Sequence, residues 1–327
     1  MSEQKSIGVV MCIHAECDKD IKWNIRYPLK FRSIVEIIPS YFENIFRRFS
    51  VKPTYLISSE VFDHKESVDI LLAQREKAEL GTHFHGEFLE PGRISMPREN
   101  KDYGCLYEEH IERAKLIWLT QKFEETFGFR PQSFAAGRWG ATGRTARILS
   151  DLGYIADSSV VSFMNRRHLG LNEMPLLKTG ETYFPSEASI VSSGNLKLVE
   201  IPVTALPASK LYSGPFNYLK LMRSFYRNRK GTDKLIWLRP TFSSFGQMKK
   251  LIDTVIATQN SDIVFNMMFH SFEAVPGLSP YVKTKEESRV FIKRLETILK
   301  YLAKKKSVFM TLKEVANKFI QKNQRVQ

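Results

Sequence analysis

Short apolar runs alternate with longer amphipathic stretches along most of the chain. In the stretch 284–305, Leu295, Ile298 and Leu302 share one stripe and lysines occupy the outward side, as in a helix packed on a core. Such stretches predict helices at residues 31–49, 64–79, 106–127, 142–152, 216–229, 243–258, 284–305 and 311–323. The apolar runs, rich in Val, Ile and aromatic residues, predict strands at residues 7–13, 54–58, 80–84, 132–136, 154–157, 198–203, 235–238, 263–269 and 307–310.

This alternation of strand and helix predicts a mostly parallel α/β sheet with right-handed crossovers. About eight such units fit a closed or partly closed (β/α) barrel better than an open sheet, because no glycine-rich dinucleotide turn follows an early strand. We expect residues 1–327 to form a single domain. The irregular segments 86–105, 158–197 and 271–283 are then expected to be loop insertions.

The composition is that of an ordinary globular protein, since 43% of the 327 residues are hydrophobic and 26% are charged. The net charge of +14 favours anionic partners such as phosphates, nucleic acid or acidic membranes. Three scattered cysteines argue for a reducing compartment. The N-terminal residues lack the features of a signal peptide, and no uncharged apolar stretch is long enough to span a bilayer. We therefore expect a cytoplasmic protein, with any membrane contact peripheral.

Polar residues of ligand and catalytic types follow the predicted strands. In a parallel barrel the chemistry lies where strands end and loops begin, so these positions are candidate site residues. They are His14, Glu16 and Asp18 after the first run; His83, His85 and Glu87 after the third; Arg138 and Trp139 after the fourth; Asp157 after the fifth; Arg239 after the run at 235; and His270 and Glu273 after the run at 263.

The pair His83 and His85 is the sharpest local signal for a metal site. Strand residues two apart point the same way, so both imidazoles could bind one cation, with an acidic residue of the first strand as a further ligand. The alternative is two strand-end histidines that only form local hydrogen bonds. His14 shares its strand phase with Cys12 and Glu16, which leaves a Cys, His and Glu ligand set open, although a free cysteine is more typical of a core.

Other chemistries find less support in the sequence. It contains no G-x-S-x-G elbow and no Walker phosphate loop. Residues 216–250 carry nine Lys or Arg against the single acid Asp233, with aromatic residues interspersed, and this stretch could follow a nucleic-acid backbone. No known nucleic-acid-binding signature accompanies it. Solvated helix faces and core aromatics are the favoured interpretation, and nucleic-acid binding is the lesser alternative.

The order of the motifs resembles that of the NodB-homology polysaccharide deacetylases. An acidic motif follows the first strand, "GTHFHGE" the third, "AAGRWGATGRTARILSDLGYIADSSV" the fourth, and "FHSFEAVPGLSPYV" comes late. These segments are most similar to the WalW-like lipopolysaccharide-biosynthesis branch, and the likeness covers about residues 7–320. The resemblance implies a deformed (β/α) barrel of seven or eight strands and a divalent metal, most often Zn²⁺. It implies the hydrolysis of an N-acetyl group on an amino sugar.

The resemblance also implies roles for particular residues. His83 and His85 would be metal ligands, and Glu16 and Asp18 would supply ligand and general base. His270 would be the general acid, and Arg138 would orient the base. The likeness is not complete, because the usual first motif has two adjacent aspartates and the usual histidines are four residues apart. A catalytically inactive, glycan-binding or scaffolding relative therefore remains the alternative.

The expected substrate is an N-acylated sugar in polysaccharide or lipopolysaccharide biosynthesis. A phosphate-linked glycan precursor would suit the basic composition, because Lys and Arg bind phosphate. Five further candidates are expected to contact this substrate: His14, Glu87, Trp139, Arg239 and Glu273. The sequence does not predict the oligomeric state.

Overall fold

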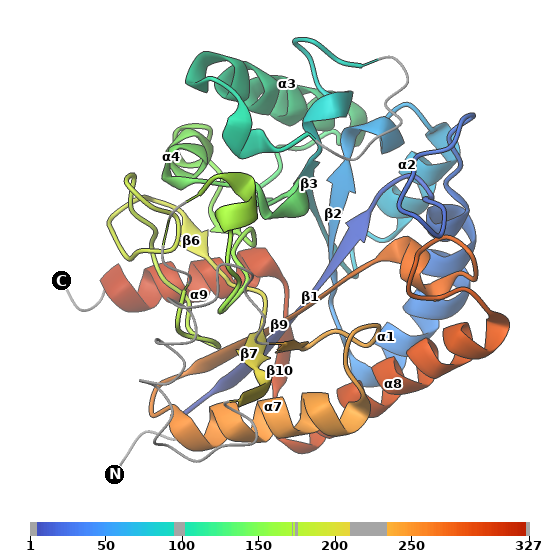
Figure 1. The fold of residues 1–327 in the computed structure, drawn as a ribbon, viewed down its shortest axis with the longest axis vertical. Helices are drawn as coiled ribbons and strands as arrows, with labels where there is room; N and C mark the ends of the chain where they lie inside the picture. The colour runs from blue at the N-terminus through green and yellow to red at the C-terminus, as the bar shows by residue number, and fades with distance from the viewer. Residues whose placement is uncertain (1–4, 95–101, 172, 174–175, 210–233, 325–327) are drawn as a thin grey trace.

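A curled, mostly parallel sheet lies at the centre of the structure, with helices around it (Figure 1). The structure is a computed structural model and describes residues 5–94, 102–171, 173, 176–209 and 234–324. Neighbouring strands pair in parallel in chain order: β1 (Ile7–Ala15), β2 (Thr54–Ser58), β3 (Glu79–Phe84), β4 (Ser133–Ala136), β5 (Ala156–Asp157) and β6 (Val199–Glu200). On the other edge of β1, β9 (Ile263–His270) pairs with it in parallel. On the β2 edge, β10 (Val308–Met310) pairs with the first residues of β1, and β2 pairs with the residues that follow.

The sheet curls until the segment after β6 reaches β9. The backbone N–H of Thr204 donates to the carbonyl oxygen of Asn266 at 3.0 Å. The side chain of Asn266 in turn donates to the carbonyl oxygen of Ile201 at 2.7 Å. The expected barrel-type fold is confirmed as a half-barrel of parallel strands, whose two sides meet through individual hydrogen bonds.

Two strand predictions differ from the structure for physical reasons. The predicted strand 198–203 keeps only the two residues of β6, since Pro202 cannot donate to a sheet and ends the regular pairing. The run at 235 forms β8 (Leu235–Trp237), which pairs antiparallel with the unpredicted strand β7 (Ala205–Pro207). This short ribbon therefore does not extend the parallel sheet.

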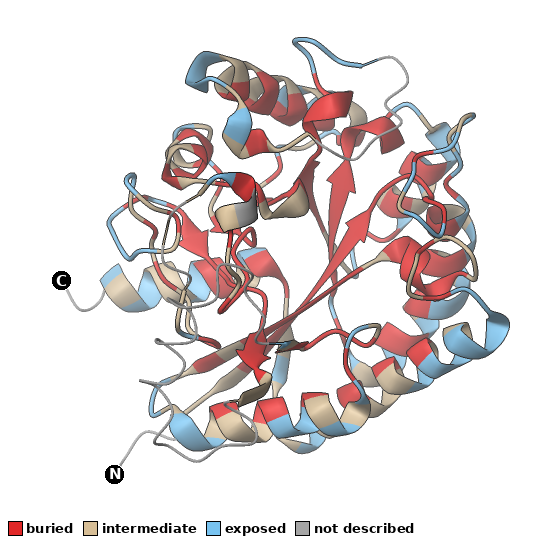
Figure 2. Cartoon of the chain, in the orientation of Figure 1, coloured by how far each residue is buried: buried red, intermediate tan, exposed pale blue. Residues whose placement is uncertain are grey.

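Most predicted helices are present, and their polar outer sides face solvent (Figure 2). Thr142, Ser244 and Thr284 begin three of them with capping boxes, which satisfy free backbone N–H groups. The predicted helix 31–49 divides into a π-helical part, Ser33–Phe42, and the α-helix that follows, while the predicted helix 216–229 lies outside the described residues. The α-helices are α1 (Glu43–Phe49), α2 (Lys65–Ala73), α3 (Glu109–Phe127), α4 (Gly143–Asp151), α7 (Phe245–Thr258), α8 (Lys285–Lys304) and α9 (Leu312–Gln324).

The two-residue period of β1 separates the core from the site. Val9, Met11 and Ile13 belong to the large apolar cluster that packs under the helices. Val10 and Cys12 belong to a second apolar cluster on the opposite face, which also includes residues of α9. His14 follows Val10 and Cys12 in the same phase, so the carboxyl end of this face changes from apolar to ligand-type side chains.

Asp157 and Glu200 form a buried carboxyl pair on β5 and β6. They are in-register neighbours in the sheet, and neither is exposed to solvent. Burial disfavours the charged forms and raises the pKa of both groups, and their mutual repulsion raises that of Glu200 further. The pair therefore holds a proton in the folded protein at pH values where ordinary carboxyl groups are ionised. Asp157 acts within the sheet and does not contact the candidate ligands described below.

Glu200→Gln should make the stability of the protein less dependent on pH. A carboxyl group with a raised folded pKa contributes stability at low pH, and that contribution is lost as the pH rises from the ordinary carboxyl range through the folded value. At pH 8 we expect the free energy of unfolding of the variant to exceed that of the parent by roughly 1–3 kcal/mol. At pH 5 we expect the two free energies of unfolding to be similar. Denaturant unfolding followed by circular dichroism tests this, with the exposed Glu286→Gln as control. Equal pH slopes in parent and variant would contradict it.

Candidate metal centre

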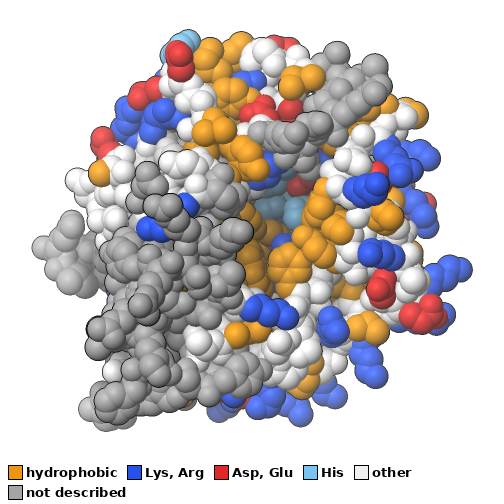
Figure 3. Space-filling view, in the orientation of Figure 1, with side chains coloured by type: hydrophobic (Ala, Val, Ile, Leu, Met, Phe, Trp, Pro, Cys, Tyr) orange, Lys and Arg blue, Asp and Glu red, His pale blue; other side chains and the backbone are white. Residues whose placement is uncertain are grey.

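The histidines at the carboxyl ends of β1, β3 and β9 meet at the base of a hollow. Figure 3 shows histidine side chains in this hollow, with hydrophobic side chains around its mouth. The sheet register explains the meeting, because His14 on β1 pairs with His270 on β9, and His83 lies at the end of β3. Three segments far apart in the sequence thus present their side chains to one point, as parallel strand ends do.

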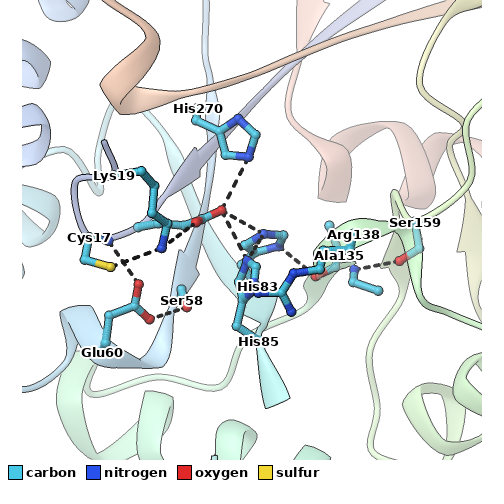
Figure 4. Close-up of polar contacts among 12 residues, drawn as sticks. Cys17, Lys19, Ser58, Glu60, His83, His85, Ala135, Arg138, Ser159 and His270 are labelled. Atoms are coloured by element: carbon cyan, nitrogen blue, oxygen red, sulfur yellow. Dashed lines mark hydrogen bonds and ion pairs between the residues drawn. The ribbon is translucent and has the colours of Figure 1, made fainter. Parts of the chain in front are cut away.

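Glu16 lies at the centre of this site, one residue beyond β1. Figure 4 shows His83, His85 and His270 around one carboxylate oxygen, on which their dashed lines meet. The Oε1 atom of Glu16 is 3.2 Å from Nε2 of His83, 3.3 Å from Nε2 of His85 and 3.4 Å from Nε2 of His270. The two Nε2 atoms of His83 and His85 are 3.1 Å apart. The structure therefore brings together the predicted ligand histidines, the predicted general acid and one of the two predicted acidic residues.

Hydrogen bonds to Nδ1 fix the orientation of two of the histidines, His83 and His270. Nδ1 of His83 donates to the carbonyl oxygen of Ala135 at 2.9 Å. Nδ1 of His270 lies 2.7 Å from Oε1 of Glu273. Such partners leave Nε2 as the atom that faces the site, an arrangement typical of metal-binding and proton-transferring histidines.

Two arginine–glutamate ion pairs support the histidines from behind. Arg239 bonds to Glu273, which carries the hydrogen bond to His270. Arg138 bonds to Glu87, whose Oε1 is 3.6 Å from Nδ1 of His85. Arg239 and Glu273 therefore contact each other and His270, while Glu87 lies beside His85. Arg138 also donates to the carbonyl oxygen of Asp102, and its expected role in orienting the base stays a prediction.

The donor atoms of Glu16, His83 and His85 fit a divalent cation. Tetrahedral Zn²⁺ with bonds of about 2.0–2.1 Å places its ligands about 3.3 Å apart. The three donor atoms here are 3.1 to 3.3 Å apart. Oε1 of Glu16 is buried and has no hydrogen-bond partner among the described residues, a costly condition that a cation would relieve.

The electrostatics of the site also favour a cation. Burial disfavours the ionised form of Glu16, but the charges of His85 and Lys19 outweigh this and hold its pKa well below the usual range. Burial lowers the pKa of His83 to about 4. Burial also lowers the pKa of His85, but the nearby carboxylate of Glu16 outweighs burial and raises this pKa to about 9. The site therefore carries one proton on His85, which cation binding would release.

Lys19 and Glu60 belong to the site and were not predicted. Nζ of Lys19, which is 3% exposed, lies 3.4 Å from Oε2 of Glu16 and donates to Sγ of Cys17 at 3.1 Å. Glu60 accepts the backbone N–H of Cys17 at 3.0 Å. Glu60 follows the second predicted strand, so the same strand-end rule could have found it. Lys19 gives no comparable signal, because a lysine in a polar loop is normally exposed.

The structure keeps Asp18 and Cys12 away from the candidate ligands. The carboxylate of Asp18 accepts the backbone N–H groups of Arg32 at 2.9 Å and Ser33 at 3.2 Å, at the start of the segment Ser33–Phe42. Asp18 belongs to neither group of donor atoms that could hold a metal ion in the described part of the chain. Cys12 lies in the apolar cluster on the sheet, and burial raises the pKa of its thiol, as expected of a core cysteine.

Strained backbone beside the site accompanies a close approach of the chain to His85. Arg138 and Trp139 both have left-handed backbone, with φ of 53° and 60°, which is costly for residues with a side chain. A Cβ atom on the preceding Gly137 would lie 2.5 Å from the carbonyl oxygen of Phe84 and 2.8 Å from Cε1 of His85. Glycine is therefore required at position 137 to admit the imidazole.

Aromatic side chains surround the histidines in an unbroken series of contacts, which we call the aromatic belt. Its members, in order, are Trp139, Trp237, Phe242, Tyr281 and Trp23, and adjacent ring centroids lie 4.8 to 5.8 Å apart. The belt meets the histidines at both ends, since Trp139 is 6.3 Å from His14 and Trp23 is 5.3 Å from His270. Of these residues only Trp139 was a predicted site residue.

Solved structures of similar fold include two polysaccharide deacetylases. A protein classed as a polysaccharide deacetylase from Mycobacterium smegmatis is 12% identical, with a TM-score of 0.52 over 99% of this chain and 93% of its own. A second, from Pseudomonas aeruginosa PAO1, is 13% identical, with a TM-score of 0.53 over 96% and 90%. Puue allantoinase is 13% identical, with a TM-score of 0.54 over 97% and 91%. No protein-family model matches the sequence, and no curated protein matches it.

The fold is therefore that of polysaccharide deacetylase structures. Identities of 12 and 13% establish the fold alone, and the same fold also carries an allantoinase. These structures do not single out the lipopolysaccharide-biosynthesis branch that the motifs suggested. The reaction must therefore be argued from the site.

Gly137→Ala should weaken metal binding. The added methyl group would meet the carbonyl oxygen of Phe84 and the ring of His85, so the end of β3 and the imidazole must shift, and disturbing the groups around a metal ligand typically costs 10- to 100-fold in metal affinity. We expect the dissociation constant for Zn²⁺, measured by competition with a chromogenic chelator, to rise by about tenfold or more. Gly246→Ala is the matched control, because a Cβ atom there would meet nothing within 4 Å. Unchanged affinity in Gly137→Ala would show that His85 does not need this space.

Proposed function

We propose that the protein is a metal-dependent hydrolase that removes an N-acetyl or related N-acyl group from an amino sugar. The observation that carries the proposal is the convergence of Glu16, His83 and His85 on one point at the base of the hollow, beside His270. The polysaccharide deacetylase fold and the order of the sequence motifs support the same reaction class.

Glu16, His83 and His85 would hold the cation, and a carboxylate with two imidazoles is a donor set that suits Zn²⁺. A divalent cation bound there supplies Lewis-acid polarisation of the amide carbonyl and activation of water. The protein fixes the ligands in advance through Ala135 and the Glu87–Arg138 pair. Glu16 is held between the histidines and Lys19, so its carboxylate stays ionised.

His270 would donate a proton to the leaving amine. Its Nδ1 is held by Glu273, and its Nε2 faces the same oxygen of Glu16 as the candidate ligands do. The charge of Arg239 offsets burial and keeps the pKa of Glu273 at about 2, so this carboxylate can stabilise the charged imidazole. The arrangement is that of a general acid oriented by a carboxylate.

Glu16 would accept the proton of the attacking water as well as serve as a ligand. Asp18 was the other candidate for this task, but two backbone N–H groups engage its carboxylate. Oε2 of Glu16 points away from the histidines toward Lys19 and is the second oxygen of the same group. One carboxylate thus takes two functions that adjacent aspartates divide in the family this chain resembles.

The aromatic belt and the basic composition suit a phosphate-linked glycan precursor as substrate. Half-buried aromatic rings provide an apolar wall, and a few convergent polar groups at the base of a cleft fix the orientation of a ligand. The net charge of +14 favours a substrate with phosphate groups. We place this reaction in the cytoplasm, in lipopolysaccharide or related polysaccharide biosynthesis, within one domain spanning residues 1–327.

Two other interpretations remain as outcomes of the tests. The engagement of Asp18 favours an inactive glycan-binding or scaffolding barrel, which would bind sugar without turnover. The nucleic-acid alternative rests on residues 216–250, of which 216–233 lie outside the described residues. In the described part, Arg239 is buried against Glu273 and Lys249 pairs with Asp253, so these charges do not form an open basic track. No helix in the described part is long and apolar enough to cross a membrane.

Acetate release from nucleotide-linked N-acetylamino sugars tests the reaction. We expect the zinc-loaded parent to release acetate and His270→Gln to lower kcat by about 10²- to 10⁴-fold, because the general acid is lost. His110→Gln is the matched control, since His110 is 71% exposed on a helix surface. Substrate binding without turnover in the parent would favour the inactive barrel. Full activity in His270→Gln would contradict the role of His270.

The ligand assignment has a test that does not depend on activity. The parent should bind Zn²⁺ near stoichiometrically, and the double variant His83→Ala/His85→Ala should lose it at equal protein concentration, because two of three ligands are removed. Metal content by mass spectrometry after dialysis measures this. His64→Ala/His110→Ala serves as control, because His64 instead begins α2 through a hydrogen bond to the backbone of Ser67. An equal zinc content in both double variants would contradict the assignment of His83 and His85 as ligands.

A further inference from the structure

A second group of donor atoms overlaps the candidate metal centre. In the described part of the chain, His14, Glu16 and His270 each offer a ligand atom, and these atoms lie within 4.8 Å of one another. Glu16 belongs to this group and also to the group with His83 and His85. Its Oε1 atom is nearly equidistant from His83, His85 and His270, at 3.2, 3.3 and 3.4 Å. One carboxylate oxygen is thus shared by two sets of imidazoles.

His14 has a feature that its packing does not explain. Its side chain is 2% exposed, and its Nε2 atom has no hydrogen-bond partner among the described residues. A buried polar nitrogen without a hydrogen-bond partner destabilises the folded state, and most buried polar atoms in proteins therefore have a partner. His14 lies directly beside His270 in the register of β1 and β9, with the two rings edge to face at 5.2 Å. His14 is thus a buried imidazole with an unpaired nitrogen, next to His270, which belongs to the same group of donors.

We propose that His14, Glu16 and His270 bind a second divalent cation, next to the one proposed for Glu16, His83 and His85. Oε1 of Glu16 would be shared between the two cations, as bridging carboxylates are in two-metal sites with a spacing of about 3.5–4 Å. The second cation would give the buried imidazole of His14 a polar partner. Two imidazoles and one carboxylate are a donor set that Zn²⁺ accepts.

The second cation would act as an inhibitor, a statement that rests on the proposed function. His270 is the proposed proton donor, and its Nε2 atom cannot hold both a proton and a cation. Glu273 occupies Nδ1, so the ring has no other nitrogen to present to the leaving amine. Activity should therefore rise as the first cation binds and fall as the second binds, with excess Zn²⁺ reducing the rate by tenfold or more.

We expect the second site to bind its cation more weakly than the first site does. The donors of the first site are already spaced at 3.1 to 3.3 Å, close to the edges of a zinc tetrahedron. In the second site, Nε2 of His270 lies 3.4 Å from Oε1 of Glu16, and this oxygen is already a donor of the first site. The first cation also brings positive charge close to the second, which weakens binding further.

Native mass spectrometry and calorimetric titration with Zn²⁺ test the second site directly. The parent protein should bind two equivalents in two phases, and His14→Leu should bind one, with the tighter phase retained. His270→Gln should also lose the weaker phase, which guards against a folding defect particular to His14→Leu. His110→Leu is the control and should bind as the parent does. One equivalent in the parent at saturating Zn²⁺, or two in His14→Leu, would overturn the proposal.

Activity measurements separate this proposal from the proposed function. Inhibition of acetate release by excess Zn²⁺ should disappear in His14→Leu, measured as the ratio of rates at high and low Zn²⁺ within each variant. Two bound equivalents without any amide hydrolysis would keep the second site and count against the proposed function. Hydrolysis with one bound equivalent, insensitive to excess Zn²⁺, would keep the function and exclude the second site.

Discussion

The ionised side chain of Glu16, buried at the meeting point of three strands, is the interaction on which the site depends. A carboxylate taken out of water is strongly destabilising unless positive charge and hydrogen-bond donors surround it. The fold meets this need with Lys19 on one oxygen and three imidazoles on the other. The ion pairs behind His85 and His270 hold those rings in place, and Gly137 leaves room for one of them.

The same arrangement connects the fold to its chemistry. The carboxyl ends of parallel strands lie at one edge of the sheet, so side chains at the ends of β1, β3 and β9 lie close to one point. The apolar residues below belong to the same strands, and their packing keeps the strand ends in register. The site is therefore built on rigid elements, as a metal centre with ligand spacing of a few tenths of an ångström requires.

The chain departs from the family that its motifs resemble in a consistent way. The acids of the first motif, Glu16 and Asp18, are two residues apart rather than adjacent, and Asp18 accepts hydrogen bonds from the start of a helix. Glu16 is left as the one carboxylate at the centre of both donor groups in the described residues. Three imidazoles lie around its Oε1 atom, those of His83, His85 and His270.

The sequence by itself determined the alternation of strands and helices and most of the candidate ligands. Both follow from local rules: apolar periodicity marks the strands, and ligand-type residues at strand ends mark the site, as at His83, His85 and His270. Only the tertiary structure decided between Glu16 and Asp18, because two residues of one loop differ in which distant groups they reach. It also decided the places of Lys19, His14 and the aromatic belt. Their roles depend on burial and on contacts between strands far apart in the chain, which no local pattern encodes.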